Sequence, residues 1–319
     1  MRGILLVVVL FAVQSLLADD CALHECKTNQ VGLVVYQGDN LPILKSIASG
    51  SVDLIYIDPP FNTGRRQERK RVQTVDGGKV EASSYGFDDS FEDYIAFLRP
   101  RIIEAYRILK PDGALFFHID YREVHYCKIM LDEIFGRKCF MNEIIWAYDY
   151  GGRSKRRWSA KHDNILWYVK DPKKYTFNYD EVDRIPYMAP SLAGPEKAAV
   201  GKTVTDVWWH TIVSPTGKEK TGYATQKPRG IIDRIVKVHS NPGDLLLDFF
   251  AGSGTLGESA YALGRNAILV DCSEDAINVM KRRFSNFNVE WVQPSRLKDV
   301  EVEVRQKTSS YKLVGEQGD

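Results

Sequence analysis

The chain has 319 residues, of which 44% are hydrophobic and 27% are charged, so it can bury a substantial core. This composition excludes collagen-like and disordered chains and favours one large domain, or one domain with an insertion. The formal net charge of +1 excludes a uniformly cationic protein that coats nucleic acid, so such contacts must come from local clusters of cations. Two clusters occur: Arg65, Arg66, Arg69, Lys70 and Arg71, and then Arg153, Lys155, Arg156, Arg157 and Lys161.

Cysteine usage and the N-terminus point to different compartments. The five cysteines are scattered and odd in number, which indicates a reduced intracellular protein, and Cys21 and Cys26 have the spacing of neither a zinc site nor a redox pair. Residues 1–18 nevertheless have the charged start, apolar run and small-residue boundary of a secretory signal, although they are too short for a membrane span. We favour an upstream start codon or an apolar helix packed on the domain. We therefore expect an intracellular protein, cytoplasmic or nucleoid-associated, without membrane association; secretion is the alternative.

Strand and helix signals alternate through the first half of the chain. β-Branched runs at 31–36 and 52–57 predict buried parallel strands, which end in loops that carry Asp39 and Asp58. The polar, basic stretch 62–84 shows no periodicity and predicts a mobile surface loop. The other elements expected here are helices at 41–49, 94–109 and 123–135 and strands at 114–119 and 143–148.

The alternation breaks between residues 149 and 222, where glycine, proline, aromatic and basic residues mix around strands at 164–169 and 207–212. Such a segment predicts an insertion or a cap on the sheet. The alternation then resumes with helices at 228–240, 255–263 and 273–284 and strands at 245–249 and 267–270. This order of elements predicts an α/β fold, with a doubly wound, mostly parallel sheet and helices on both faces.

A glycine motif, Asp248-Phe249-Phe250-Ala251-Gly252-Ser253-Gly254-Thr255, leads from a strand into a helix. Its two glycines allow a tight turn and let a ligand approach the main chain, and the helix start behind them suits a polar or anionic group. A dinucleotide-binding protein would be the rival, but the third glycine of that fingerprint is missing. Asp271, after the next strand, is placed for ribose hydroxyls in either case.

A second motif, Asp58-Pro59-Pro60-Phe61, follows a buried strand and therefore emerges at the carboxyl edge of the sheet, where open α/β folds bind ligands. The two prolines stiffen the turn. Asp58 and the Pro59 carbonyl are placed to accept the two hydrogens of an amino group on a flat ring, while Phe61 stacks on that ring. An ordinary strand-ending turn is the alternative for the tetrapeptide by itself.

With both motifs in place, the chain resembles the β-group of DNA amino-methyltransferases, whose catalytic tetrapeptide precedes the cofactor motif in a circularly permuted order. Asp58 to Phe61 matches the family's catalytic motif, and the resemblance covers about residues 31–291. It implies the class I fold of methyltransferases that depend on S-adenosylmethionine, with S-adenosylmethionine as the cofactor. The positions that it implies for cofactor binding are Asp39, Asp248, Phe250, Gly252, Gly254, Thr255, Asp271, Lys227 and Pro228, of which Lys227 and Pro228 belong to the element Thr225-Gln226-Lys227-Pro228.

The resemblance also implies an order of domains and a partner, double-stranded DNA; a homodimer is left open. The expected parts are an apolar or signal-like segment 1–30, a catalytic half 31–148, a target-recognition region 149–222, a cofactor-binding half 223–292 and a polar tail 293–319. DNA contacts are expected from Arg65, Arg66, Arg153, Arg156, Arg157 and Lys161, and shape or stacking contacts from Trp158, Tyr187, Trp208 and Trp209. For each residue taken singly, a solvated charge or a core aromatic is the favoured alternative. No metal is expected, because the histidines, including His118, His125 and His162, lack ligand spacing and are interpreted as structural.

The expected reaction is site-specific methylation of adenine N6 in DNA, as in restriction-modification. A base amino group inside a duplex is unreachable, so the target base is expected to flip into the pocket. Hydrogen bonds to Asp58 and the Pro59 carbonyl would make the weakly nucleophilic nitrogen more tetrahedral and direct it at the sulfonium methyl. Within the family, Asp at the first motif position resembles the adenine enzymes. The alternatives are cytosine N4 methylation, methylation of RNA or protein amino groups, and a catalytically silent nucleic-acid-binding protein with the same fold.

Overall fold

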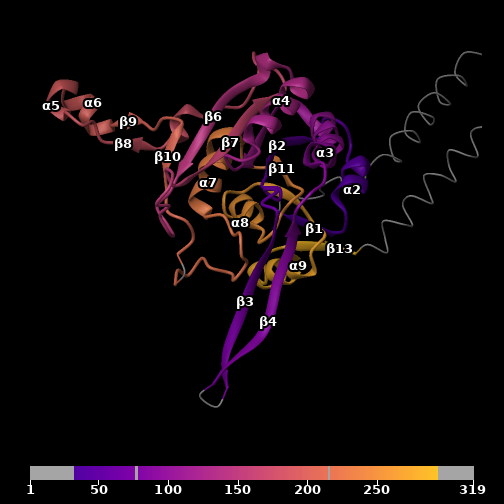
Figure 1. Cartoon of the computed structure of the whole chain (residues 1–319). Coiled ribbons are helices and arrows are strands. Elements are labelled where there is room, and N and C mark those ends of the chain that lie inside the picture. Colours follow the sequence, from indigo (N-terminus) through magenta and orange to yellow (C-terminus); the bar gives the residue numbers. More distant parts are fainter. Residues whose placement is uncertain (1–31, 76–77, 215, 294–319) are drawn as a thin grey trace, which may run out of the picture. The chain divides into compact units, whose positions relative to one another are not determined.

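A nine-stranded sheet organises the described part of the chain (Figure 1). The computed structural model describes residues 32–75, 78–214 and 216–293, all within one compact unit. The strand order across the sheet is β10-β6-β7-β5-β2-β11-β12-β1-β13. In chain order these strands are β1 (Leu33–Gln37), β2 (Val52–Ile57), β5 (Leu109–Ile119), β6 (Phe140–Ala147), β7 (His162–Val169), β10 (Val207–Trp209), β11 (Leu245–Asp248), β12 (Asn266–Asp271) and β13 (Val289–Val292).

The sheet is mostly parallel, as predicted. Within the described sheet, β7 runs antiparallel to both of its neighbours, β5 and β6, and the remaining pairings are parallel. Because β7 is reversed, its first residues lie at the same edge as the last residues of the parallel strands. That edge therefore collects side chains from nearly every strand.

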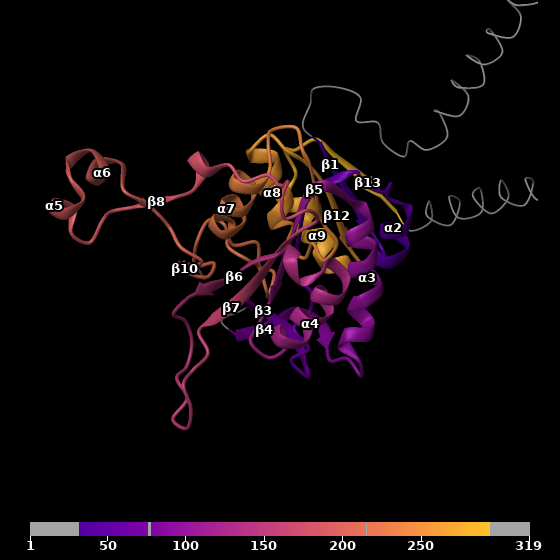
Figure 2. The same ribbon diagram turned by 90° about the horizontal axis from the view of Figure 1, so that it is seen from above.

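Helices cover both faces of the sheet, which confirms the doubly wound α/β class (Figure 2). Because successive side chains of a strand point to opposite faces of the sheet, Leu54 and Tyr56 of β2 pack into one core, and Ile55 and Ile57 pack into the other. The first core includes residues of α7 (Arg229–His239), α8 (Thr255–Ala262) and α9 (Glu274–Arg283), and the second includes residues of α2 (Asn40–Ser46), α3 (Tyr94–Ile108) and α4 (Val124–Phe135).

The prediction of a mobile loop at residues 62–84 was wrong. Strands β3 (Arg65–Val75) and β4 (Gly78–Asp89) form an antiparallel hairpin, with Arg65 paired to Asp89 at its base. The hairpin extends away from the sheet (Figure 1). A polar ribbon of this kind satisfies its backbone groups by pairing alone, so it shows none of the apolar alternation that marks a strand in a core.

The segment 149–222 is only partly an addition to the sheet. Its strands β7 and β10 belong to the central sheet, with β7 between β5 and β6. The other elements of this segment are short: η2 (Tyr179–Glu181), β8 (Arg184–Ile185), α5 (Pro190–Ala193), α6 (Pro195–Val200) and β9 (Lys202–Thr203). The short η1 (Arg137–Cys139) lies before them, between α4 and β6.

The predicted signal-like segment and the polar tail lie outside the described residues. Among the helices that the structure does describe, none combines the length and the apolar character that a membrane crossing requires.

Candidate active site

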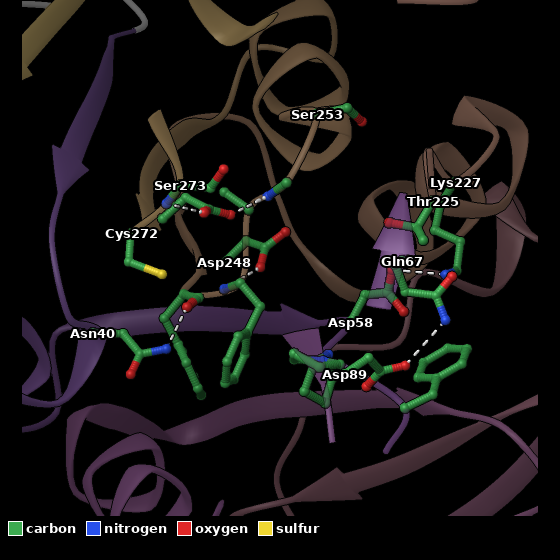
Figure 3. Close-up of a pocket in the computed structure, with 18 of the residues that line it drawn as sticks. Asn40, Asp58, Gln67, Asp89, Thr225, Lys227, Asp248, Ser253, Cys272 and Ser273 are labelled. Carbon is green, nitrogen blue, oxygen red and sulfur yellow. Dashed lines mark hydrogen bonds and ion pairs between the residues drawn. The ribbon is translucent and has the colours of Figure 1, made fainter. Parts of the chain in front are cut away.

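A cavity of about 650 Å³ lies at the carboxyl edge of the sheet, where we predicted a ligand site from the sequence (Figure 3). Asp39 follows β1, Asp58 follows β2 and Asp120 follows β5, and all three line the cavity. The reversed strand β7 contributes Asp163 from its first residues. Both predicted motifs border this one cavity, so the structure brings together residues that lie far apart in the sequence.

Asp58 is held by a lysine from the other half of the chain. Lys227 Nζ lies 2.7 Å from Asp58 Oδ2, and both side chains are largely buried. The same ammonium lies 4.7 Å from the centre of the Phe61 ring. The Lys227 carbonyl accepts a hydrogen bond from Thr255 Oγ1 at 3.2 Å. Lys227 therefore links the catalytic motif to the glycine motif, a contact that the expected role in cofactor binding did not include.

The second oxygen of Asp58 lacks a partner within the part of the chain that the structure describes. Among the described residues, Asp58 Oδ1 is buried and accepts no hydrogen bond. A buried acceptor of this kind costs free energy unless a ligand supplies the missing donor. Next in the motif, Tyr94 Oη donates to the Pro60 carbonyl at 2.5 Å, whereas no such bond from the described residues reaches the Pro59 carbonyl. Asp58 and Pro59, which both line the cavity, therefore carry acceptors that the described residues leave unsatisfied.

The glycine motif forms the opposite end of the cavity. Gly252 has φ +50°, and a Cβ at this position would lie 3.1 Å from the Tyr223 ring. Its N–H donates to Asp271 Oδ2 at 2.7 Å, and Ser273 N donates to Asp271 Oδ1 at 2.8 Å. Burial raises the pKa of Asp271. Each carboxylate oxygen keeps a further lone pair, so Asp271 can still accept hydrogen bonds from ligand hydroxyls.

Two residues predicted to bind the cofactor do not line the cavity. Gly254 starts α8 with φ +74°, and a Cβ there would lie 2.6 Å from Phe284 and 2.8 Å from Met280. This glycine therefore permits α8 to pack closely against α9. Pro228 precedes α7 and accepts a hydrogen bond from Ile231 N. The cavity wall includes the other predicted positions: Asp39, Lys227, Asp248, Phe250, Gly252, Thr255 and Asp271.

A buried arginine, which the sequence did not single out, braces the loops near the glycine motif. Arg101 of α3 lies 2.9 Å from Asp39 Oδ1 and donates to Asn40 Oδ1 at 2.6 Å. Asn40 Nδ2 in turn donates to the Phe249 carbonyl at 2.7 Å. The Arg101 guanidinium also stacks on Phe97, 3.9 Å from the ring centre. This network joins the ends of β1 and β11. The sequence did not reveal it, because Arg101 lies in an ordinary helical pattern of apolar and polar residues.

A second network lies behind the catalytic motif. The Tyr56 hydroxyl lies 2.7 Å from His118 Nδ1, and His118 Nε2 lies 3.2 Å from Asp163 Oδ2. Tyr148 Oη donates to Asp163 Oδ1 at 3.0 Å. Burial alone would raise the pKa of Asp163, but the hydrogen bond from His118 and the positive charge of Lys227 outweigh it and lower this pKa. Asp163 thus carries a second charge at the cavity wall, which sequence reasoning missed because β7 was expected in an inserted region.

The predicted DNA-binding residues divide into two groups. Arg65, Arg66 and Arg157 line a second concavity beside the first. By contrast, Arg153 lies 2.6 Å from Asp149, and Lys161 donates to the Tyr150 carbonyl. The remaining one, Arg156, is exposed. Of the aromatics proposed for shape or stacking, Trp158 and Trp209 are exposed, Tyr187 is partly exposed and Trp208 packs in the core.

The described residues contain no cluster of three or more His, Cys, Asp or Glu side chains with the arrangement of a metal site.

Comparison with known proteins adds a family to this geometry. Residues 52–282 match the family model of the N6/N4 DNA methylases. The type II methyltransferase M.HpaI of Haemophilus parainfluenzae is 32% identical over 249 residues, which cover 77% of this chain and 72% of M.HpaI. The DNA adenine methyltransferase YhdJ of Escherichia coli K12 is 31% identical over 262 residues, 78% of this chain and 81% of YhdJ.

Two solved structures share the fold. The complex of M1.HpyAVI with SAM has a TM-score of 0.54 at 24% identity and covers 79% of this chain and 98% of its own. The cytosine-N4-specific PvuII DNA methyltransferase has a TM-score of 0.59 at 17% identity and covers 85% and 92%. At these identities the likeness concerns the fold alone.

Proposed function

Since the chain belongs to the N6/N4 DNA methylase family, we propose that it transfers a methyl group from S-adenosylmethionine to N6 of an adenine in double-stranded DNA. The observation that carries this proposal is that Asp58, a residue of the cavity wall, has a buried Oδ1 with no hydrogen-bond partner among the described residues. An exocyclic amino group supplies the missing donor. The Pro59 carbonyl is the second acceptor that such a group requires.

The residues around the glycine motif fit the cofactor. The missing side chain at Gly252 keeps the wall open next to Tyr223, and Asp271 is fixed by two backbone amides with lone pairs left for ribose hydroxyls. Asp39 and Phe250 line the same end of the cavity, and we assign them to the adenosine group. S-adenosylmethionine, once bound, supplies the electrophilic methyl group of a sulfonium.

Within the catalytic motif each residue has a separate task. Lys227 holds Asp58 Oδ2, so that Oδ1 remains directed to the substrate, and we therefore propose Lys227 as a positioning residue. Phe61 stacks on the target base, which reaches the cavity only after it has flipped out of the duplex. Hydrogen bonds from the amino group to Asp58 and the Pro59 carbonyl fix the nitrogen with its lone pair free for attack.

Two observations support adenine over cytosine. Asp occupies the first position of the catalytic motif, as in the adenine enzymes that the motif resembles. In addition, YhdJ, at 31% identity, is named a DNA adenine methyltransferase. The cytosine-N4-specific structure shares only the fold at 17% identity. Cytosine N4 remains the alternative target.

The test uses the full chain, S-adenosylmethionine with an isotopically labelled methyl group and unmethylated genomic DNA. After digestion to nucleosides, mass spectrometry should detect labelled N6-methyladenine, with Asp58→Ala as the inactive control that still binds the cofactor. Labelled N4-methylcytosine would support methyl transfer to DNA but would show that the target base is cytosine. Label in RNA or protein alone would refute DNA as the substrate. Cofactor binding without transfer to any substrate would favour a catalytically silent nucleic-acid-binding protein with the same fold.

A further inference from the structure

A second concavity, of about 430 Å³, opens beside the active-site cavity. The two cavities share Thr63, Gln67 and Arg122 in their walls. The two cavities therefore adjoin along these three residues. The residues that line this second concavity are all polar: Thr63, Arg65, Arg66, Gln67, Arg122 and Arg157.

The four arginines come from three separate segments. Arg65 and Arg66 begin β3, Arg122 follows β5, and Arg157 lies between β6 and β7. No carboxylate of the described residues lines this concavity. Arg65 and Arg157 therefore face a concavity whose described lining holds no carboxylate, and their guanidinium groups suit an anion with several oxygens, since each planar fork donates two parallel hydrogen bonds.

Buried carboxylates fix part of this wall in advance. Asp120 is 5% exposed, pairs with the Arg122 guanidinium and accepts from Arg122 N at 3.0 Å. Asp89, which is 1% exposed, accepts from Thr63 Oγ1 at 2.6 Å and from Gln67 Nε2 at 3.3 Å, and Figure 3 shows the second of these contacts. Groups that are already oriented lose little entropy when they bind a ligand.

Asp89 also ties this wall to the catalytic motif. Its Oδ1 accepts from Asn62 N at 2.7 Å, directly after Phe61, and its backbone carbonyl accepts from Gly64 N at 2.8 Å. The base of the β3–β4 hairpin, the second concavity and the catalytic motif are therefore one connected unit. An anion bound in the concavity is held at a fixed position relative to Asp58.

We propose that the second concavity binds the DNA backbone phosphate next to the target nucleotide and so anchors this nucleotide while its base is in the active site. This inference rests on the proposed function, because the base in the first cavity carries its own phosphates with it. Phosphate contacts of this kind position the substrate and carry no sequence information. The site should therefore contribute equally at methylated and at related sequences.

The test is a single neutral methylphosphonate, placed in turn at each linkage around the target in a duplex that contains the methylated sequence. Binding is measured by fluorescence anisotropy, separately from methyl transfer. In the wild type, one linkage beside the target should weaken binding by about tenfold, the effect of a lost charge-assisted hydrogen bond. In Arg157→Gln or Arg65→Gln, the unmodified duplex should bind about tenfold more weakly, and the methylphosphonate at that linkage should have little further effect.

Lys173→Gln is the control, because it removes one exposed positive charge that lies outside the expected DNA contacts and does not line either cavity. This variant should keep the full sensitivity of the wild type to the methylphosphonate. The salt dependence of log affinity should become shallower by about 0.9 in Arg157→Gln for one lost phosphate contact. All of these variants change exposed residues, so folding should be unaffected. Thermal melting of each variant checks this expectation.

The outcomes separate the two proposals. Equal sensitivity to the methylphosphonate in the wild type, Arg157→Gln and Arg65→Gln would overturn the phosphate site even if the DNA is methylated. If the methylphosphonate weakens DNA binding by the wild type but not by Arg157→Gln or Arg65→Gln, the phosphate site is supported even if the methylated base proves to be cytosine. If the wild type binds duplex DNA with no sensitivity at any linkage near the target, the phosphate site is also refuted.

Discussion

Asp58→Asn should slow methyl transfer strongly because of the orientation that Lys227 imposes on the new amide. Lys227 carries only donors and lies 2.7 Å from Asp58 Oδ2, so it would select the oxygen of the introduced amide as its partner. The amide NH2 would then occupy the place of Oδ1 and face the amino group of the base. Two donors would oppose each other where the wild type has an acceptor.

The size of this effect follows from the burial of the pair. The Asp58 and Lys227 side chains are 16% and 12% exposed, so solvent screens them little. A hydrogen bond to a charged group contributes about 1.5–3 kcal/mol. Because the lost acceptor is replaced by a donor, the upper part of this range applies, and kcat should fall by about 100-fold. Affinity for S-adenosylmethionine should stay within about twofold, since the binding residues at the glycine motif are unchanged.

A double substitution tests the reasoning itself. In Asp58→Asn combined with Lys227→Met, no ammonium selects the amide oxygen, so the amide can turn this oxygen toward the base. Single-turnover methylation should then be about fivefold faster than in Asp58→Asn alone, the effect of one neutral hydrogen bond. Calorimetric titration and thermal melting verify cofactor binding and folding. A folded double variant that is no faster than Asp58→Asn would show that Lys227 does not set the orientation.

Two other predictions concern cofactor binding and stability. Gly252→Val should weaken S-adenosylmethionine binding by at least about tenfold, because φ is +50° and a Cβ would lie 3.1 Å from Tyr223; unchanged affinity in calorimetric titration would remove the glycine from the site. His239 packs against Phe116 and Trp167, and burial lowers its pKa to about 3. An unfolded histidine protonates near pH 6.5, so this neutral histidine contributes fully above pH 6.5, and the free energy of unfolding should fall by about 2 kcal/mol from pH 6.5 to 5. Urea unfolding should show that His239→Gln loses this slope; an unaltered slope would mean that other groups cause it.

The core of the fold was predictable because burial imposes a visible pattern. Within the run Val52–Ile57, residues 54 to 57 alternate between the two cores, and the predicted and observed bounds of the strand agree. The hairpin at β3 and β4 was missed because its strands are polar. The signal that was available is Asp76-Gly77-Gly78, a pair of turn-forming dipeptides between two strands of high polarity.

The site was predictable where a residue follows a buried strand. Asp58 and Asp271 are recognisable because the carboxyl edge of a parallel sheet is where ligands bind. Asp120 has the same position after β5, so this rule would have found it as well. Asp163 escapes the rule, since it begins a strand whose reversed direction only the pairing with β5 and β6 reveals. Arg101 and Asp89 act through contacts across the fold, and local sequence does not encode these.

Lys227 shows how the two halves of the active site depend on each other. Its element precedes the glycine motif in the sequence, and its carbonyl accepts from Thr255 of that motif, which is why a role at the cofactor seemed natural. Its ammonium, however, pairs with Asp58 at the start of the catalytic motif. Lys227 therefore contacts the glycine motif through its backbone and Asp58 through its side chain. Asp58 Oδ1 has no partner among the described residues, while Oδ2 is paired with Lys227, so the two halves of the chain together determine how this carboxylate is satisfied.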